Sequence, residues 1–274
     1  MLYFFLSPHF SELGAEGLVG YFWKDIPVAA SLLLAFVYIL IPYLIGSVNT
    51  AIIVSDKFYH DDIRNYGSGN AGFTNIMRIY GKRAAIVTFV GDFLKTVLAI
   101  MIGWCCFGYL TAYIAGFSCF LGHIFPVYYR FRGGKGILCL TAMLFMLDWR
   151  IFLVLLAIFL LVVAMTKYIS FGSVLCSVLY PLVFNRMNKS LLTLVPHMYL
   201  CQLIAVAVAV IVVIKHWGNL RRIFDGTESK FQFKKSRETP EEEATAAAGS
   251  EPAREKKINY GALPGQNAGK KNKK

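Results

Sequence analysis

The stretch LLTLVPHMYLCQLIAVAVAVIVVI, at residues 191–214, indicates the fold class of this chain. It carries no charged side chain and is longer than the about 20 residues that a helix needs to cross a bilayer. The whole chain has the same character, because 57% of its 274 residues are apolar and only 16% are charged. Soluble domains carry about 25% charged residues. The composition therefore excludes a typical soluble enzyme and predicts an all-α integral membrane protein.

Seven apolar segments predict about seven transmembrane helices, at residues 28–54, 84–106, 109–127, 136–147, 151–166, 170–184 and 191–214. The fourth would be only about 18 Å long as a helix, which is too short for a hydrocarbon core of about 30 Å. Glycines precede it, and irregular backbone at membrane depth is tolerated only inside protein or beside a wet cavity. We therefore expect a functional site next to this segment.

Basic residues predict the orientation. With the N-terminus outside, the inner connections hold twelve lysines and arginines, whereas the outer connections hold only Arg150, Arg186 and Lys189. Cytoplasmic loops are enriched in Lys and Arg. The N-terminus is therefore expected outside and the C-terminus in the cytoplasm.

The two ends differ from the predicted transmembrane domain, residues 28–228. Residues 1–27 lack the basic start and cleavage site of a signal peptide and are expected to form an interfacial extension. Residues 229–274 contain 11 Lys/Arg and 6 Asp/Glu, which predicts a disordered basic cytoplasmic tail. No nucleic-acid partner is expected, because no binding fold accompanies the charge. The six cysteines form no CxxC pair, so neither a metal site nor a disulfide framework is predicted.

Three polar, glycine-containing segments fall on the predicted inner face, and the first is GSGNAGFTNIMR at Gly67–Arg78. Its glycines match GxGxxG, with Asp92 about 20 residues further on. A dinucleotide site is excluded because a membrane segment, rather than a strand, precedes it. Successive glycines can still form an anion-binding nest, with hydrogen-bond donors from Ser68, Asn70, Thr74, Asn75 and Arg78. The alternative is a polar loop whose arginine reaches the membrane interface.

The second segment, RFRGGKG at Arg130–Gly136, places three cations and three glycines just before a predicted helix. Glycine lets a backbone approach a ligand closely, and a helix N-terminus attracts anions. The GxxxxGK[ST] spacing of a P-loop is absent. The alternative is an ordinary basic inner loop, which leaves the glycines unexplained.

The third segment, HWGNLRR at residues 216–222 followed by GTE at residues 226–228, sits where the last predicted span ends. By itself this segment is most simply interpreted as a group of basic residues at the membrane surface, where the last span ends. Asp92 and Lys95 lie inside a predicted span and three residues apart, on one helical face. Such residues usually face the protein interior, so they predict a structural pair, or else they line the site.

The chain has no GxSxG, HExxH, CxxC or HxxxxD pattern. No carboxylate–histidine base is evident in the three segments either. The chemistry is therefore expected to rely on positioned cations and hydrogen-bond donors rather than on a strong general base.

Together, the three segments resemble those of the bacterial integral-membrane acyl-phosphate:glycerol-3-phosphate acyltransferases. The family patterns GSGNxGxTNxxR, GHxFPVxxxFxGGKG and HxxNxxRxxxGTE match Gly67–Arg78, Gly122–Gly136 and His216–Glu228, in the same order. The pair Asp92 and Lys95 resembles a further family feature, and the resemblance covers about residues 30–228. It implies a multi-pass protein of the bacterial inner membrane with its active site on the cytoplasmic face.

The resemblance also implies the reaction. An acyl group passes from acyl phosphate to the 1-hydroxyl of glycerol 3-phosphate, giving 1-acyl-glycerol 3-phosphate (lysophosphatidic acid) and phosphate, the first acylation of phospholipid biosynthesis. No cofactor or metal is expected, and the partners are the two substrates and membrane lipids.

The resemblance and the residue types together predict three sets of site residues. The catalytic set is Ser68, Arg78, His216 and Asn219. The substrate-binding set is Gly69, Asn70, Thr74, Asn75, Arg132, Gly133, Gly134, Lys135 and Gly136. The structural set is Asp92, Lys95 and Glu228.

Some positions depart from the family pattern. Phe73 stands where a small Ala is usual and could narrow the pocket, and Ile137-Leu138-Cys139 replaces a more usual Val-Ala-Thr. These changes bear on rate and acyl-chain preference.

Two other function classes stay open. A transporter of phosphorylated metabolites would also need anion pockets, but it should show midplane residues and repeat symmetry. A scaffold whose basic tail recruits partners would not need three glycine-rich polar segments.

Overall fold

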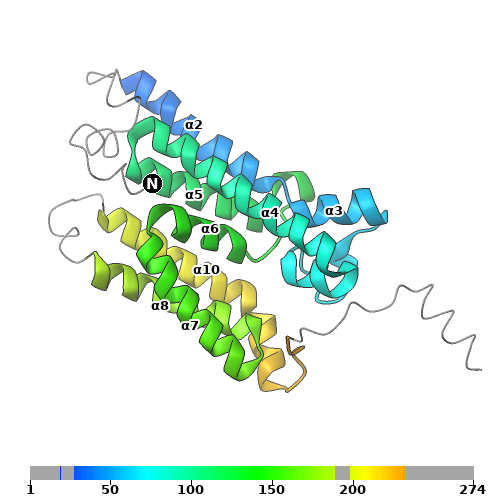
Figure 1. The fold of residues 1–274 in the computed structure, drawn as a ribbon. Coiled ribbons are helices and arrows are strands. Elements are labelled where there is room, and N and C mark those ends of the chain that lie inside the picture. Colours follow the sequence, from blue (N-terminus) through cyan, green and yellow to red (C-terminus); the bar gives the residue numbers. More distant parts are fainter. Residues whose placement is uncertain (1–18, 20–27, 189–197, 232–274) are drawn as a thin grey trace, which may run out of the picture. The chain divides into compact units, whose positions relative to one another are not determined.

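The computed structural model describes residue 19, residues 28–188 and residues 198–231, which form helices joined by short connections (Figure 1). The elements are α2 (Val28–Ser47), α3 (Thr50–Tyr59), the 3-10 helix η2 (Ile63–Asn65), α4 (Phe73–Phe107), α5 (Tyr109–Ile124), the 3-10 helix η3 (Val127–Tyr129), α6 (Ile137–Leu147), α7 (Trp149–Thr166), α8 (Ile169–Met187) and α10 (Met198–Phe224). No strand occurs in these ranges. Residues 232–274 of the predicted tail, and all of the predicted N-terminal extension except Val19, lie outside the described residues.

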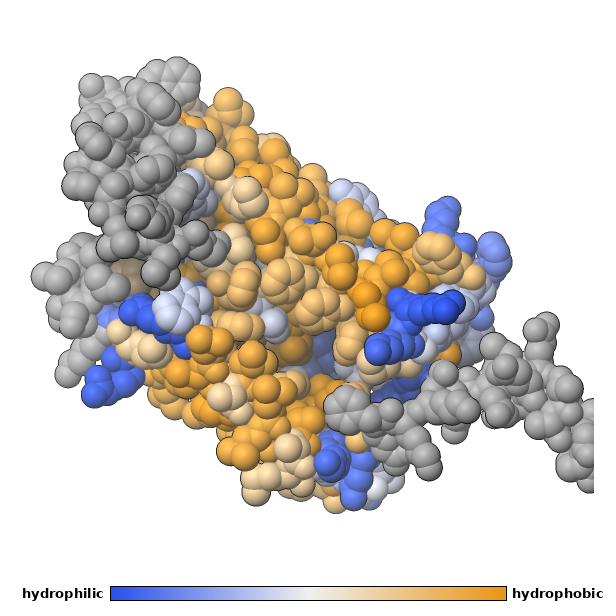
Figure 2. All heavy atoms as spheres, viewed as in Figure 1, coloured by the Kyte–Doolittle hydropathy of each residue, from blue (hydrophilic) through white to orange (hydrophobic). Residues whose placement is uncertain are grey.

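Six helices of the described part are long and apolar enough to cross a membrane. The helix α6 has 11 residues, about 17 Å, and is too short to cross by itself, as the sequence predicted. Large apolar side chains remain exposed on the spans; Met165 of α7, for example, is 77% exposed. Figure 2 shows this apolar surface, with hydrophilic residues gathered toward its ends, one group being around α3 and the start of α4. Such a surface is suited to lipid rather than to water.

Two predicted boundaries differ from the structure. The first predicted segment, residues 28–54, is divided because Asn49 caps a new helix by accepting a hydrogen bond from the backbone N–H of Ile52 at 3.1 Å. The last segment was predicted to end at residue 214, but α10 continues to Phe224. The polar residues of the third segment therefore lie on a helix, with His216 and Asn219 both buried on it.

The helix α4 is broken at Gly81, whose φ of 81° and ψ of −171° lie outside the helical region. Only glycine adopts this conformation readily. The break folds the first two turns back, so that the rings of Phe73 and Phe89 lie 6.0 Å apart. In a straight helix these residues would be separated by about 24 Å. The first polar segment is thereby brought beside the membrane-spanning part of the same helix.

The core is centred on α5. Helices α2 and α5 meet at backbone contact, because a Cβ on Gly46 or Gly122 would overlap main-chain atoms of the other helix. Small residues at a crossing are the usual way for membrane helices to pack closely. On its other side α5 joins the main apolar cluster, which includes Tyr113, Phe120, Met143, Tyr180, Phe184 and Val208. A second cluster, including Ile63, Ile76 and Ala85, supports the connection between α3 and α4.

Candidate active site

Side-chain hydrogen bonds join the loop before α6 to the end of α10. Lys135 donates from Nζ to Oδ1 of Asn219. Asn219 in turn donates from Nδ2 to Oε1 of Glu228 at 2.6 Å and to Oγ of Ser170 at 3.0 Å. The Ser170 hydroxyl donates to the same Glu228 oxygen at 2.6 Å, and Arg222 Nε donates to Oε2 at 2.8 Å. The second and third polar segments therefore form one cluster.

Burial sets the charges in this cluster. Burial lowers the pKa of Lys135 to about 8. The nearby Glu228 carboxylate partly offsets this shift, whereas the cations Arg222 and Arg78 increase it. Burial alone would raise the pKa of Glu228, but hydrogen bonds from Ser170, Asn219 and Arg222, together with the Arg222 charge, bring it below its ordinary value. Glu228 is therefore ionised at neutral pH, whereas Lys135 titrates close to it. The effect of Arg78 on Lys135 also places the first polar segment within electrostatic reach of the second.

The first polar segment forms a compact loop around the buried amide of Asn75. Its Oδ1 accepts a hydrogen bond from the backbone N–H of Ser68 at 3.0 Å. Its Nδ2 donates to the carbonyl oxygens of Tyr66 at 2.9 Å and Ile63 at 3.3 Å. The Asn75 amide is thus used within the loop, whereas Ser68 and Arg78 are exposed.

Gly134 lies in direct contact with the first segment and with α5. Its backbone N–H donates to the carbonyl oxygen of His123 at 3.1 Å. A Cβ added here would overlap Nε2 of His123 and would lie 2.7 Å from the carbonyl oxygen of Ala71. That Ala71 oxygen also accepts a hydrogen bond from Asn49 Nδ2 at 3.3 Å. Only glycine fits at residue 134 without displacing the backbone.

Asp92 and Lys95 form an ion pair with 2.7 Å between Oδ1 and Nζ, and both side chains are almost completely buried. Lys95 also donates to the carbonyl oxygen of Val48 at 2.7 Å and lies 3.1 Å from Nδ1 of His123. The carbonyl oxygen of His123 accepts a hydrogen bond from the Gly134 N–H. The ion pair therefore supports the glycine loop through His123. The predicted sharing of one helical face is confirmed.

The variant Asp92→Asn is expected to lower the free energy of unfolding by about 3–5 kcal/mol, because the Lys95 ammonium would stay buried without its counter-ion. Thermal unfolding in detergent would measure this. Asp56→Asn is the matched control, since Asp56 and Lys57 form a 3.9 Å pair in which both side chains are exposed, and it should leave stability unchanged. Equal melting temperatures for the two variants would contradict the prediction.

His216 is buried on α10, with Nδ1 2.9 Å from the carbonyl oxygen of Val212. A carbonyl oxygen can only accept, so Nδ1 carries the proton and Nε2 of the neutral ring is an acceptor. Asn219 follows one turn later, inside the cluster described above.

The remaining predicted site residues fall in two places. Gly69, Asn70 and Thr74 belong to the loop and first turn of α4, and Gly133 and Gly136 flank the Gly134–Lys135 pair. The Arg132 side chain is exposed, and its carbonyl oxygen accepts a hydrogen bond from Arg64. Phe73 packs on Phe89.

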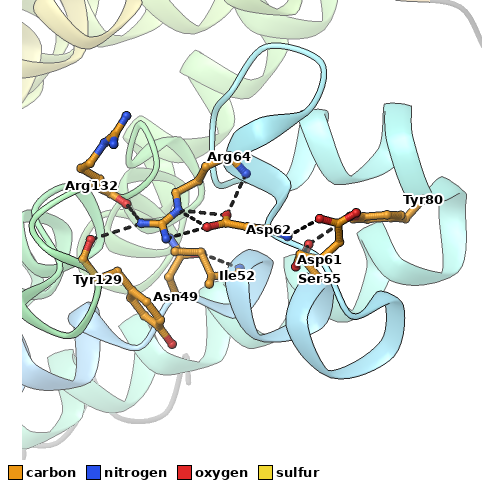
Figure 3. Close-up of polar contacts among 9 residues, drawn as sticks. All are labelled: Asn49, Ile52, Ser55, Asp61, Asp62, Arg64, Tyr80, Tyr129 and Arg132. Carbon is orange, nitrogen blue, oxygen red and sulfur yellow. Dashed lines mark hydrogen bonds and ion pairs between the residues drawn. The ribbon is translucent and has the colours of Figure 1, made fainter.

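Sequence reasoning missed three contributors. Arg64 counted only toward orientation, although it contacts the second segment through Tyr129 and Arg132 (Figure 3). His123 was part of a matched pattern without a role. Ser170 carried no local signal, since its partner Glu228 is 58 residues away. Among the described residues, no group of His, Cys, Asp and Glu could hold a metal ion.

Known proteins are similar to this chain in sequence and in the arrangement of helices. The family model described as glycerol-3-phosphate acyltransferase matches residues 36–226. The glycerol-3-phosphate acyltransferase of Finegoldia magna is 40% identical over 191 residues, which cover 69% of this chain and 91% of the relative. That of Mycoplasmopsis agalactiae is 34% identical over 235 residues, which cover 75% and 98%.

Two crystal structures are also similar, both of PlsY (YgiH), an integral membrane glycerol 3-phosphate acyltransferase. The glycerol 3-phosphate form aligns with a TM-score of 0.63 and the lysophosphatidic acid form with 0.60. Each is 26% identical and covers 74% of this chain and 96% of the PlsY chain. This similarity confirms the predicted all-helical membrane fold. On the match of its sequence over residues 36–226, this chain belongs to the glycerol-3-phosphate acyltransferase family.

Proposed function

We propose that this chain transfers an acyl group from acyl phosphate to the 1-hydroxyl of glycerol 3-phosphate, giving lysophosphatidic acid and phosphate in the bacterial inner membrane. The proposed site lies on the cytoplasmic face, which the basic residues of the inner connections support. A reporter enzyme that is active only in the cytoplasm, fused after residue 231, tests this orientation.

The observation that carries the proposal is the polar cluster around Lys135, which joins residues of the second and third segments, while Arg78 of the first segment acts on Lys135 through its charge. Both proposed substrates bear phosphate, and the cluster offers Lys135, Arg78 and Arg222 as cations beside the glycine backbone of residues 133–136. Glycine loops and arginine forks are suited to phosphate. The carboxylate of this cluster, Glu228, is occupied by Arg222, Asn219 and Ser170, which leaves Lys135 and Arg78 for an incoming anion.

The reaction needs little more than charge and position. The 1-hydroxyl oxygen forms a bond to the acyl carbonyl carbon, and the bond from that carbon to the phosphate oxygen breaks. Ser68 and Arg78 hold the acyl phosphate and the charge that develops on it, helped by Gly69, Asn70 and Thr74 from the loop that Asn75 shapes. Fixed donors of this kind stabilise developing charge without reorganising.

The second substrate is assigned to the loop before α6. Residues Gly133–Gly136 and Arg132 cradle glycerol 3-phosphate. The predicted hydrogen bonds from His216 and Asn219 to phosphate do not fit the structure, because Nε2 of His216 is an acceptor and both N–H groups of the Asn219 amide are already donated to Glu228 and Ser170. Asn219 instead holds Lys135 beside the glycine loop. The hydroxyl proton passes to a phosphate oxygen of the substrate, since orientation rather than a strong base drives the step. The family's lysophosphatidic acid form of PlsY is consistent with this product.

An apolar cleft begins next to Gly136, at the end of the glycine loop, and suits the acyl chain. Its lining starts at Ile137, directly after Gly136, and continues along Leu140, Thr141 and Leu144 of α6. Residues of α7 and α8 complete it: Phe152, Leu155, Leu156, Phe159, Ser173 and Cys176. The phosphate end of an acyl phosphate can therefore lie at the polar cluster while its chain lies among apolar side chains.

The decisive experiment uses purified protein with glycerol 3-phosphate and either palmitoyl phosphate or palmitoyl-CoA, following phosphate and lysophosphatidic acid. We expect product from acyl phosphate only. Product from the thioester would keep the acyltransferase and overturn the donor. A folded sample that gives no product with either donor would favour transport of phosphorylated metabolites instead.

The pH dependence follows from Lys135. Because its pKa is lowered to about 8, Lys135 is a cation below that pH and loses its charge above it. We expect kcat/KM for glycerol 3-phosphate to fall as pH rises through about 8, and this limb should move to higher pH in Lys135→Arg. An unmoved limb would contradict the assignment. A separate acidic limb that disappears in His216→Ala would identify His216, rather than substrate phosphate, as the proton acceptor.

A further inference from the structure

The guanidinium of Arg64 links the loop before α4 to the loop before α6 (Figure 3). Its Nη1 donates to two main-chain carbonyl oxygens, that of Tyr129 at 3.2 Å and that of Arg132 at 3.3 Å. On its other edge, Nε and Nη2 donate to the carboxylate of Asp62 at 2.7 to 3.0 Å. The guanidinium group is planar and rigid. Because Asp62 holds the edge formed by Nε and Nη2, the direction in which Nη1 points is fixed as well.

The two carbonyl groups that Arg64 binds flank a strained part of the chain. Arg130 and Phe131 have φ of 56° and 59°, a left-handed conformation that bulky side chains rarely adopt. Strained residues of this kind persist only where their surroundings hold them, and they cluster at functional sites. The next residues are Gly133–Gly136. The conformation of residues 130–131 therefore sets the direction in which the glycine loop enters the site.

Asp62 and Arg64 are themselves firmly placed. Asp62 caps η2 by accepting the backbone N–H of Arg64 at 2.9 Å, and Ile63 between them is completely buried in the second apolar cluster. The side-chain hydrogen bond from Arg64 lowers the pKa of Asp62, with burial opposing it, so both partners are ionised at neutral pH. The pair is anchored in the core on one side and reaches the loop on the other.

We propose that Arg64, oriented by Asp62, is a positioning residue that holds the loop of residues 127–136 in the conformation which receives the phosphate of glycerol 3-phosphate. Its hydrogen bonds go to protein atoms rather than to substrate, and it acts through the loop backbone. The substrate part of this inference rests on the proposed function; the holding of the loop does not.

The loop itself can be followed without any activity. Several of its N–H groups are hydrogen-bonded within the fold. Among them, Phe131 donates to the carbonyl oxygen of Pro126 at 2.9 Å, Arg132 to that of Tyr129 at 3.2 Å and Gly134 to that of His123 at 3.1 Å. In Arg64→Ala we expect the amide hydrogens of this loop to exchange at least about 10-fold faster than in the wild type, because local opening becomes easier. Unchanged exchange would overturn the proposal.

The kinetic consequence should be selective. In Arg64→Ala we expect KM for glycerol 3-phosphate to rise by about 10-fold or more, while KM for the acyl donor stays within about 3-fold, because lost loop order removes binding of one substrate. Arg64→Lys should recover part of the loss, since an ammonium can reach one carbonyl but cannot keep the fork. A second variant, Phe131→Gly in the Arg64→Ala background, should also recover part of it, because glycine adopts positive φ without strain.

The matched control is Lys57→Gln, which removes an exposed cation from the neighbouring helix α3 and should change neither exchange nor KM. A rise in both KM values, or a fall in kcat alone, would overturn the positioning role. If wild-type protein neither binds nor acylates glycerol 3-phosphate, the proposed function fails together with the substrate part of this proposal. The exchange measurement still decides whether Arg64 holds the loop.

Discussion

Replacing Arg78 by alanine is expected to lower kcat/KM by at least about 10²-fold, the scale on which one preorganised charge donor contributes to a transition state. Arg78 lies in the first turns of α4, with an exposed side chain whose charge nevertheless acts on Lys135. An exposed arginine contributes little to the core, so the melting temperature should stay close to that of the wild type. Steady-state kinetics with glycerol 3-phosphate and palmitoyl phosphate would measure the loss.

The control for this prediction is Arg83→Ala. Arg83 is also exposed and lies five residues further along α4, beyond the break at Gly81. It should retain wild-type kinetics if the effect at residue 78 is specific rather than a change in the overall positive potential. An Arg78→Ala protein that keeps most of its activity would remove Arg78 from the site.

The second large effect is expected from Gly134→Ala. The added methyl group would overlap Nε2 of His123 and come within 2.7 Å of the Ala71 carbonyl oxygen. Because a backbone atom cannot move aside cheaply, the loop of residues 133–136 must shift. A misplacement of about 1 Å can reduce a rate by about 10²-fold. We expect the loss mainly as a raised KM for glycerol 3-phosphate, with a smaller change in the KM for the acyl donor.

Gly218→Ala provides the comparison. Residue 218 is exposed on α10, and its Cβ would meet only Arg222 Nη1 at 3.7 Å, an ordinary contact. That variant should behave as wild type, since alanine suits a helix better than glycine does. If Gly134→Ala binds glycerol 3-phosphate normally but raises the KM of the acyl donor, the glycine loop holds the donor instead.

Hydropathy predicted most of the fold. The segments at 84–106, 109–127, 136–147 and 151–166 fall on α4 to α7, because burial in lipid needs long apolar runs that any single stretch of sequence displays. The boundaries near polar residues were less predictable. The first segment stops at Ser47 because Asn49 starts a new helix, and α10 continues to Phe224 because His216 and Asn219 are buried against protein. Neither cause appears in a hydropathy profile.

The residues of the candidate site likewise fall into those that the sequence predicted and those that it did not. Residue type and spacing predicted Arg78, Lys135, Asn219 and Glu228, because glycines and cations in short segments suit anions, and the family resemblance joined the segments. Helical periodicity predicted the Asp92–Lys95 pair for a local reason, since residues three apart share a face. The contributions of Arg64 and Ser170 were not predictable in this way. Their partners lie 65 and 58 residues away along the chain.

The sequence by itself therefore predicted that this protein crosses the membrane, where most of its spans lie, and that its three polar segments suit anions. These properties follow from side-chain chemistry and short-range spacing. Only the tertiary structure decided which atoms meet: the Lys135–Asn219 contact, the support of Gly134 by His123 and Lys95, and the hold of Arg64 on the carbonyl groups of Tyr129 and Arg132. The physical reason is that a hydrogen bond depends on position and direction to within a fraction of an ångström, and that precision arises only when the whole set of helices packs.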